Sequence, residues 1–143
     1  MTVLVLRMFK LPPKLGRTEP FTFTVYAEPA SKSNSRRLVS WGGKPHIIKS
    51  EKAARYSDDF KKQCPVLDPL FLGDLHADID IWYLSRRPDL DESLILDLLQ
   101  DRVILNDRQI KSRRVRWGLD VNPRCVITIR HCVDTDYAGA ARA

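Results

Sequence analysis

The segment from residue 75 to residue 84 most constrains the fold, because apolar and polar side chains alternate along it. One set comprises Leu75, Ala77, Ile79, Ile81 and Tyr83, and the other comprises His76, Asp78, Asp80 and Trp82. Successive side chains of a strand point to opposite faces, so this alternation predicts a β-strand with one face in the core. The second set is expected on a solvated outer face, with His76 as a surface histidine.

Other patterns of the same kind predict five further elements. They are a strand at 21–26, a helix at 50–63 capped by Ser50, a helix from 90 or 91 to 102, and strands at 109–117 and 124–132. The order strand, helix, strand, helix, strand, strand favours an α+β fold. We expect a single small domain, with a mixed sheet of about four or five strands packed against two helices.

The remaining segments predict less regular structure. Residues 29–49 are rich in Ser, Gly, Lys and Arg and are interpreted as a loop. Residues 1–20 are expected to be an N-terminal extension or edge strand, with a weak strand at 3–8. The core domain is placed at 21–133, and residues 134–143 are expected to form a flexible C-terminal tail.

Composition narrows the class of protein. The chain has 143 residues, 43% of them hydrophobic, which is enough for one domain with a real core. No apolar run approaches a membrane span, and no signal-peptide layout is present. Three cysteines are too few for a disulfide scaffold or a zinc site, and Cys125 is expected to be a small buried hydrophobe. These features favour a reducing cytoplasm.

The net charge of +6 favours a polyanionic partner, although composition alone does not separate nucleic acid from an acidic protein or a membrane surface. The cations form two clusters: Lys32, Arg36, Arg37, Lys44 and Lys49 in the first, and Lys111, Arg113, Arg114 and Arg116 in the second. Acidic residues lie between the clusters in the sequence. An anionic pocket rimmed by cations is typical of a nuclease.

The acidic residues belong to the string Arg86-Arg87-Pro88-Asp89-Leu90-Asp91-Glu92. Pro88 disfavours helical geometry at the residue before it, so the string is expected to be extended, with Asp89 and Asp91 on one side. Paired carboxylates repel unless a cation lies between them, and hard oxygen ligands suit Mg²⁺ or Mn²⁺. Asp107 would complete the site if the intervening segment folds back as a helical hairpin. The pattern therefore predicts a metal-dependent phosphodiesterase centre.

Two other interpretations of the acidic residues stay open. Asp89 could cap the following helix, with Glu92 completing a capping box and Asp91 favouring the helix dipole. This role is compatible with metal binding, because a carboxylate has two oxygens. Asp78 and Asp80 form a rival carboxylate pair, although solvated outer-face residues are the commoner case.

Five stretches resemble the RusA family of Holliday-junction resolvases. They are residues 21–26, 31–36, 49–56, 86–91 and 106–110, so the resemblance covers roughly residues 21 to 131. Its most specific parts are the Arg-Pro-Asp-Leu-Asp string and the Asn-Asp-x-Gln-Ile string, in that order. Either string alone is weak, but both after a Ser-rich basic loop are fairly specific.

The resemblance implies a homodimeric endonuclease that cuts four-way DNA junctions with Mg²⁺ or Mn²⁺, of a kind common in phages and prophages. By position, Asp89, Asp91 and Asp107 look like the three metal-binding aspartates of that family. Lys32, Asn34 and Arg36 resemble its DNA-contact loop. The full set expected to hold DNA is Lys32, Asn34, Arg36, Arg37, Lys49, Arg86, Arg87 and Lys111.

Two departures from the family pattern concern the chemistry. Glu92 stands where the family usually has an asparagine, and the usual lysine one helical turn further on is replaced by an apolar run. Arg87, Arg102 or Lys111 could supply the missing charge, and Glu92 or Asp97 could add an acidic ligand. The sequence therefore leaves three functions open: a junction resolvase, a DNA-binding protein of the same fold without catalysis, and a nuclease for other branched DNA or RNA. A purely structural basic domain is the least favoured alternative.

Overall fold

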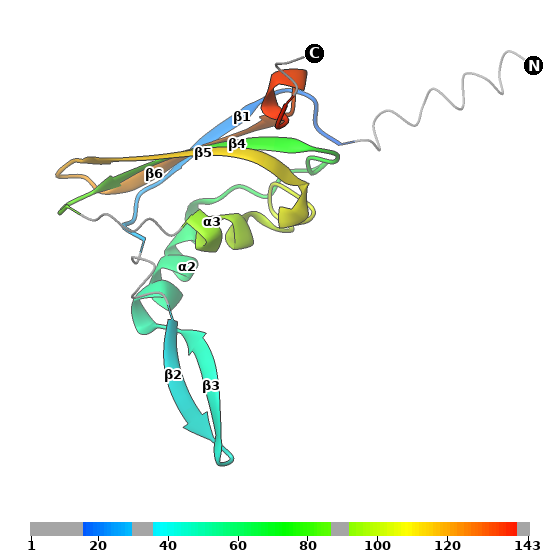
Figure 1. The fold of residues 1–143 in the computed structure, drawn as a ribbon. Helices are drawn as coiled ribbons and strands as arrows, with labels where there is room; N and C mark the ends of the chain where they lie inside the picture. Colours follow the sequence, from blue (N-terminus) through cyan, green and yellow to red (C-terminus); the bar gives the residue numbers. More distant parts are fainter. Residues whose placement is uncertain (1–15, 30–35, 87–91, 140–143) are drawn as a thin grey trace, which may run out of the picture.

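The computed structural model describes residues 16–29, 36–86 and 92–139. In chain order the elements are β1 (Phe21–Val25), β2 (Arg36–Trp41), β3 (Lys44–Lys49), α2 (Glu51–Gln63), β4 (Leu75–Tyr83), α3 (Glu92–Leu99), the 3-10 helix η3 (Asp107–Gln109), β5 (Ile110–Leu119), β6 (Arg124–His131) and the 3-10 helix η4 (Asp134–Asp136). Four strands form a mixed sheet, and both α-helices lie against one face of it (Figure 1). The α+β prediction is confirmed.

The sheet is built around β4, which pairs on both sides. The strand order is β1-β6-β4-β5; β4 runs parallel to β5 and antiparallel to β6. The apolar set of β4 is fully buried, whereas Asp78, Asp80 and Trp82 on the other face are only partly buried. Two parallel neighbours need a crossover connection, and here it carries α3 and η3 from the end of β4 to the start of β5.

The N-terminus of α2 has the predicted cap. The Ser50 hydroxyl accepts a hydrogen bond from the Ala53 amide at 3.1 Å, which satisfies one of the free amides of the first turn. The helix buries Ala53, Tyr56 and Phe60 and ends at Gln63, two residues before Pro65. Its polar side faces solvent, as the amphipathic pattern predicts.

Helix α3 is shorter than predicted, ending at Leu99 rather than at residue 102. The chain turns at Asp101, whose φ of 64° is left-handed, and the Asp101 amide donates to the Ile104 carbonyl at 2.8 Å. A left-handed residue cannot continue an α-helix, so the turn ends it. The following Val103 and Ile104 are buried in the core.

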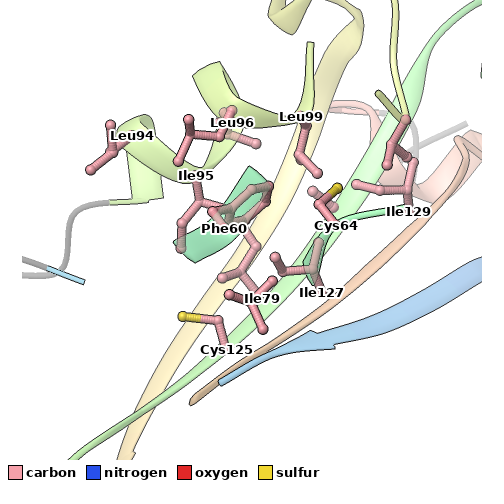
Figure 2. Packing of buried hydrophobic residues seen from close by; sticks show 14 of the residues in the cluster. Phe60, Cys64, Ile79, Leu94, Ile95, Leu96, Leu99, Cys125, Ile127 and Ile129 are labelled. Carbon is pink, nitrogen blue, oxygen red and sulfur yellow. The ribbon is translucent and has the colours of Figure 1, made fainter. Parts of the chain in front are cut away.

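The core lies between the two helices and the covered face of the sheet. Figure 2 shows apolar side chains from both layers of this core, namely Leu94, Ile95, Leu96 and Leu99 of α3, Phe60 of α2 with Cys64 just after it, and Ile79, Cys125, Ile127 and Ile129 of the sheet. Cys125 is fully buried, as predicted, and its thiol lies 3.3 Å from the Tyr56 hydroxyl. Burial raises the pKa of Cys125 to about 12, so this thiol stays protonated at neutral pH.

The loop predicted at 29–49 is wrong for residues 36–49, which form the antiparallel β2–β3 hairpin. Its two-residue turn is Gly42-Gly43, with φ of 59° and 72°. Positive φ at both central residues is the condition for the turn that matches strand twist, and glycine meets it without steric cost. Two glycines between alternating residues were therefore a hairpin pattern in the sequence.

The face of the sheet opposite the helices carries ion pairs. Arg114 donates to Asp78 at 3.1 Å, and Arg116 makes two hydrogen bonds to Asp80 at 2.8 and 2.9 Å. Asp78 and Asp80 thus lie on the predicted outer face. The surface position predicted for His76 is wrong, because only 8% of this residue is exposed.

His76 is buried because the chain after β6 covers it. Its ring nitrogens lie 2.9 Å from the Ser112 hydroxyl and 3.1 Å from Asp78, with Asp136 of η4 3.8 Å away. The Arg130 guanidinium holds Asp136 through hydrogen bonds of 2.7 and 3.0 Å. The segment predicted as a tail from residue 134 therefore begins with a short helix that packs on the sheet.

Two further predictions concern the ends of the chain. The strand predicted at 3–8 lies outside the described residues, as do residues 140–143.

Within the part of the chain that is described, no helix is long and apolar enough to cross a membrane.

Candidate metal centre and nucleic-acid interface

Asp107 is the first residue of η3, and its neighbours fix the backbone around it. The Asn106 side chain accepts from the Arg108 amide at 2.8 Å, and the Gln109 side chain accepts from the Asn106 amide at 2.9 Å. The side-chain nitrogen of Gln109 also donates to the carbonyls of Phe71 and Gly73, at 3.0 and 3.1 Å. The Asn-Asp-x-Gln string is thus a reciprocal cap anchored to the loop before β4.

The Asp107 side chain is half-buried. Among the described residues it has no hydrogen-bond or ion-pair partner. A carboxylate held on a fixed turn, with oxygens that no described residue engages, is a suitable donor for a hard cation. No group of three His, Cys, Asp or Glu side chains in the described ranges could hold a metal ion.

Asp89, Asp91 and Arg87 lie outside the described residues, but both neighbours of their segment contact β5. The Arg86 guanidinium lies over the Trp117 ring, 5.8 Å from its centroid. At the other end, a Glu92 carboxylate oxygen lies 4.0 Å from an Arg113 guanidinium nitrogen. Arg113 and Trp117 are on the same face of β5, because they are four residues apart in a strand.

The described residues next to the acidic positions adjoin one strand, β5. Residues 87–91 are flanked by residues that contact β5, and Asp107 lies three residues before β5 begins at Ile110. Helix α3, which follows Asp91, also contacts η3. Asp107 and the described residues on either side of 87–91 therefore adjoin the same edge strand.

The second cationic cluster is largely neutralised. Arg113, Arg114 and Arg116 each lie within 4.0 Å of a carboxylate oxygen. Parallel pairing of β4 and β5 sets Asp78 beside Arg114 and Asp80 beside Arg116, so these acids compensate the arginines directly. Lys111 is exposed near the start of the strand.

The first cationic cluster lies partly outside the described residues, where Lys32 and Asn34 fall. Arg36 begins β2, and the exposed Arg37 and Lys49 lie on the hairpin. The Lys49 ammonium donates to the Ser57 hydroxyl at 3.4 Å, at the junction between the hairpin and α2. The hairpin extends beyond α2 and away from the sheet (Figure 1), whereas Asp107 lies at the start of β5.

The residues that could compensate for the missing lysine have different environments. Arg102 donates to the carbonyls of Lys61 and Cys64, at 3.1 and 3.3 Å, where it satisfies the C-terminal end of α2. Asp97 is exposed on α3, whereas Glu92 is half-buried. Of the cations considered, Arg102 thus has a structural role, which leaves Arg87 and Lys111.

A hollow of about 300 Å³ lies elsewhere on the sheet, and Asp107 does not line it. Its walls are Asp80, Ile81, Trp82, Arg116, Trp117 and Gly118. Gly118 allows the Trp82 ring to approach, since a Cβ at that position would lie 3.3 Å from the indole nitrogen. The carboxylate among these lining residues, Asp80, is already paired with Arg116.

Comparison with known proteins does not assign the chain to a family. The sequence matches no protein-family model and none of the curated proteins. The resemblance to RusA resolvases therefore depends on the motifs of residues 21–26, 31–36, 49–56, 86–91 and 106–110 alone.

Proposed function

We propose that this protein is a metal-dependent, structure-specific DNA endonuclease of the RusA type, which resolves four-way junctions by paired symmetric nicks. The proposed metal ligands and catalytic residues are Asp89, Asp91 and Asp107. The observation that best supports the proposal is that Asp107 and the described residues flanking 87–91 all adjoin β5. Arg86 and Glu92 contact that strand on either side of residues 87–91, and Asp107 precedes it on a fixed turn.

The donor set fits Mg²⁺ or Mn²⁺, because all three proposed ligands are hard carboxylate oxygens. When bound, the cation supplies Lewis-acid chemistry at the scissile phosphate. The chain's own contribution is positional: the Asn106–Gln109 cap aims Asp107, and α3 carries the residues that follow Asp91. Exposed cations such as Arg86 and Lys111 would hold the flanking phosphates.

Paired nicks across a junction require two active sites, so the proposed assembly is a two-fold homodimer. The proposed location is the cytoplasm, where such an enzyme meets branched DNA and free Mg²⁺. Most of the binding energy would come from phosphate contacts, so affinity is expected to fall with salt.

The test is cleavage of a synthetic four-way junction, with Mg²⁺, with Mn²⁺ and with EDTA. We expect paired nicks with either cation and none in EDTA. Asp91→Asn and Asp107→Asn should each abolish nicking while junction binding is retained or becomes tighter, because a carboxylate facing phosphate is removed. Asp59→Asn, an exposed position on α2, is the matched control and should cleave normally.

Two results would contradict this proposal. One is full nicking in EDTA, which removes the metal requirement. The other is full nicking by both aspartate variants, which removes their role as ligands. Parallel reactions with flap, duplex and single-stranded substrates identify a nuclease with another branched substrate.

A second candidate function is DNA binding without catalysis. It is favoured by the first turns of α3, where the family lysine is expected but Leu94, Ile95 and Leu96 are all buried. No cation on this helix replaces the lysine, because the residues of α3 include no Lys or Arg. Junction binding with no nicking at saturating protein and Mn²⁺ would support this alternative.

A further inference from the structure

The β2–β3 hairpin stands apart from the rest of the domain. Its two strands pair only with each other, and Figure 1 shows it projecting beyond α2, away from the four-stranded sheet. Leu38 and Ile47, which are directly paired across the hairpin, are 70% and 73% exposed. An isolated two-stranded ribbon with exposed apolar side chains gains little from folding alone, which is typical of a binding element.

The turn end of the hairpin carries a preformed aromatic platform. Trp41 and His46 are diagonal neighbours across the ribbon, and their rings stack with centroids 3.8 Å apart and planes 7° from parallel. His46 covers one face of the indole, yet 54% of Trp41 remains exposed. The two-glycine turn holds both strands in register, so the open face of the indole is oriented before any partner binds.

The charge of the hairpin identifies the kind of partner. Residues 36–49 contain four Lys and Arg residues, namely Arg36, Arg37, Lys44 and Lys49, and no Asp or Glu. Lys44 is paired directly with Trp41, so a cation adjoins the aromatic platform. A second copy of the hairpin would carry the same charge and would be repelled, whereas a phosphate backbone complements it.

From this combination we infer that the hairpin is a DNA-binding arm, and that Trp41 stacks on an unpaired or unstacked base. Aromatic rings bind bases through their faces, and this binding needs a base that has left the continuous duplex stack. Flanking cations hold the adjoining phosphates. The inference rests on the proposed function for its substrate class and adds to it the element that recognises the branch point.

The experiment measures binding by fluorescence anisotropy, in EDTA so that no cleavage occurs. Labelled probes are a four-way junction with unpaired bases at the branch point, a blunt duplex with the same arm length, and a single strand. The variants are Trp41→Ala, Trp41→Leu and Trp41→Phe, with Tyr26→Ala as the control for loss of an exposed aromatic residue outside the hairpin. Thermal unfolding verifies that each variant is folded.

We expect the wild-type protein to bind the junction and the single strand more tightly than the duplex. Trp41→Ala and Trp41→Leu should lose about tenfold or more in affinity for the first two probes and little for the duplex. Trp41→Phe should retain most of the preference, because it keeps an aromatic face. Tyr26→Ala should bind like the wild type.

Several outcomes would overturn the inference. They are wild-type affinity of Trp41→Ala for every probe, an equal loss on all probes, or Trp41→Leu binding as well as Trp41→Phe. A change of oligomeric state in Trp41→Ala, measured by sedimentation, would assign the platform to a second copy instead. Because binding is measured without metal, failure of junction cleavage would contradict the proposed nuclease and leave this result intact.

Discussion

The four-stranded sheet with helices α2 and α3, here called the body, differs from the β2–β3 hairpin in the environment of its side chains. The same residue types are buried or paired in the body, whereas in the hairpin they are exposed or lie in a segment without acidic residues. In the body, isoleucines such as Ile79 and Ile127 are fully buried, and arginines such as Arg116 lie against carboxylates. In the hairpin, Ile47 is mostly exposed, and the segment has no acidic residue to pair with its cations. The difference separates residues that stabilise the fold from residues available to a partner.

The comparison also shows why net charge is a coarse guide to binding. In the sequence the two clusters are similar in size, with five cations in the first and four in the second. The cluster on β5 is compensated by Asp78, Asp80 and Glu92, whereas the hairpin keeps its positive charge. A polyanion is therefore expected to meet the hairpin first.

The largest expected effect is on stability, from the same substitution made in each region. Ile79→Ala should lower the free energy of unfolding by about 2–5 kcal/mol, because it leaves a cavity in the core. Ile47→Ala should change it by no more than about 0.5 kcal/mol, since that side chain is 73% exposed. Urea denaturation measures both, and equal losses would show that the hairpin side chain is packed after all.

The next effect is on DNA binding, from two double variants that remove the same charge. Arg37→Ala with Lys44→Ala in the hairpin should reduce affinity about tenfold or more at low salt, and should reduce the slope of log K against log salt by about 1.8. Arg114→Ala with Arg116→Ala on the sheet should have a much smaller effect, because those cations are paired. Anisotropy titrations at several salt concentrations make the measurement. A greater loss from the sheet variant would reverse the comparison.

The smallest effect concerns pH and the body alone. The hydrogen bonds from Arg130, together with that from the Val133 amide, hold the pKa of Asp136 far below its usual range. A lowered folded-state pKa stabilises the fold above the unfolded value of about 3.9, and the contribution is lost as pH falls towards the folded value. Asp136→Asn should therefore unfold at a lower temperature than wild type at pH 7.

The difference in unfolding temperature should shrink as pH is lowered below about 4. Ile47→Ala serves as the hairpin control, and its difference from wild type should not follow that pH dependence. A difference for Asp136→Asn that stays constant from pH 7 to pH 3 would mean that the pair contributes nothing through its charge.

Much of the body could be predicted because its patterns are local and periodic. The alternation of apolar and polar side chains located β4. Ser50 and Pro65 located the two ends of α2 to within two residues. The hairpin was missed because its polar and exposed residues weakened the alternation, although Gly42-Gly43 was a turn pattern. The shortened α3 depended on the left-handed Asp101, which composition does not reveal.

The candidate site was predicted only in part. The carboxylate pattern and the resemblance both pointed to Asp107, and the structure adds what fixes its backbone, a reciprocal cap tied to the loop before β4. Asp89 and Asp91 remain predictions, since both lie outside the described residues. Arg102 was one of three candidates for the missing charge, and its contacts with the carbonyls at the end of α2 assign it to structure.

By itself, the sequence determined which strands and helices form in the body, because side-chain periodicity along a segment dictates which face is buried. Only the tertiary structure decided which charges are compensated and which histidine is covered. Asp78 meets Arg114 through strand pairing, and Asp136 reaches His76 through the return of the chain over the sheet. Ion pairs and hydrogen bonds require two groups to be close in space. These groups are far apart in the sequence and become close only when the sheet has formed.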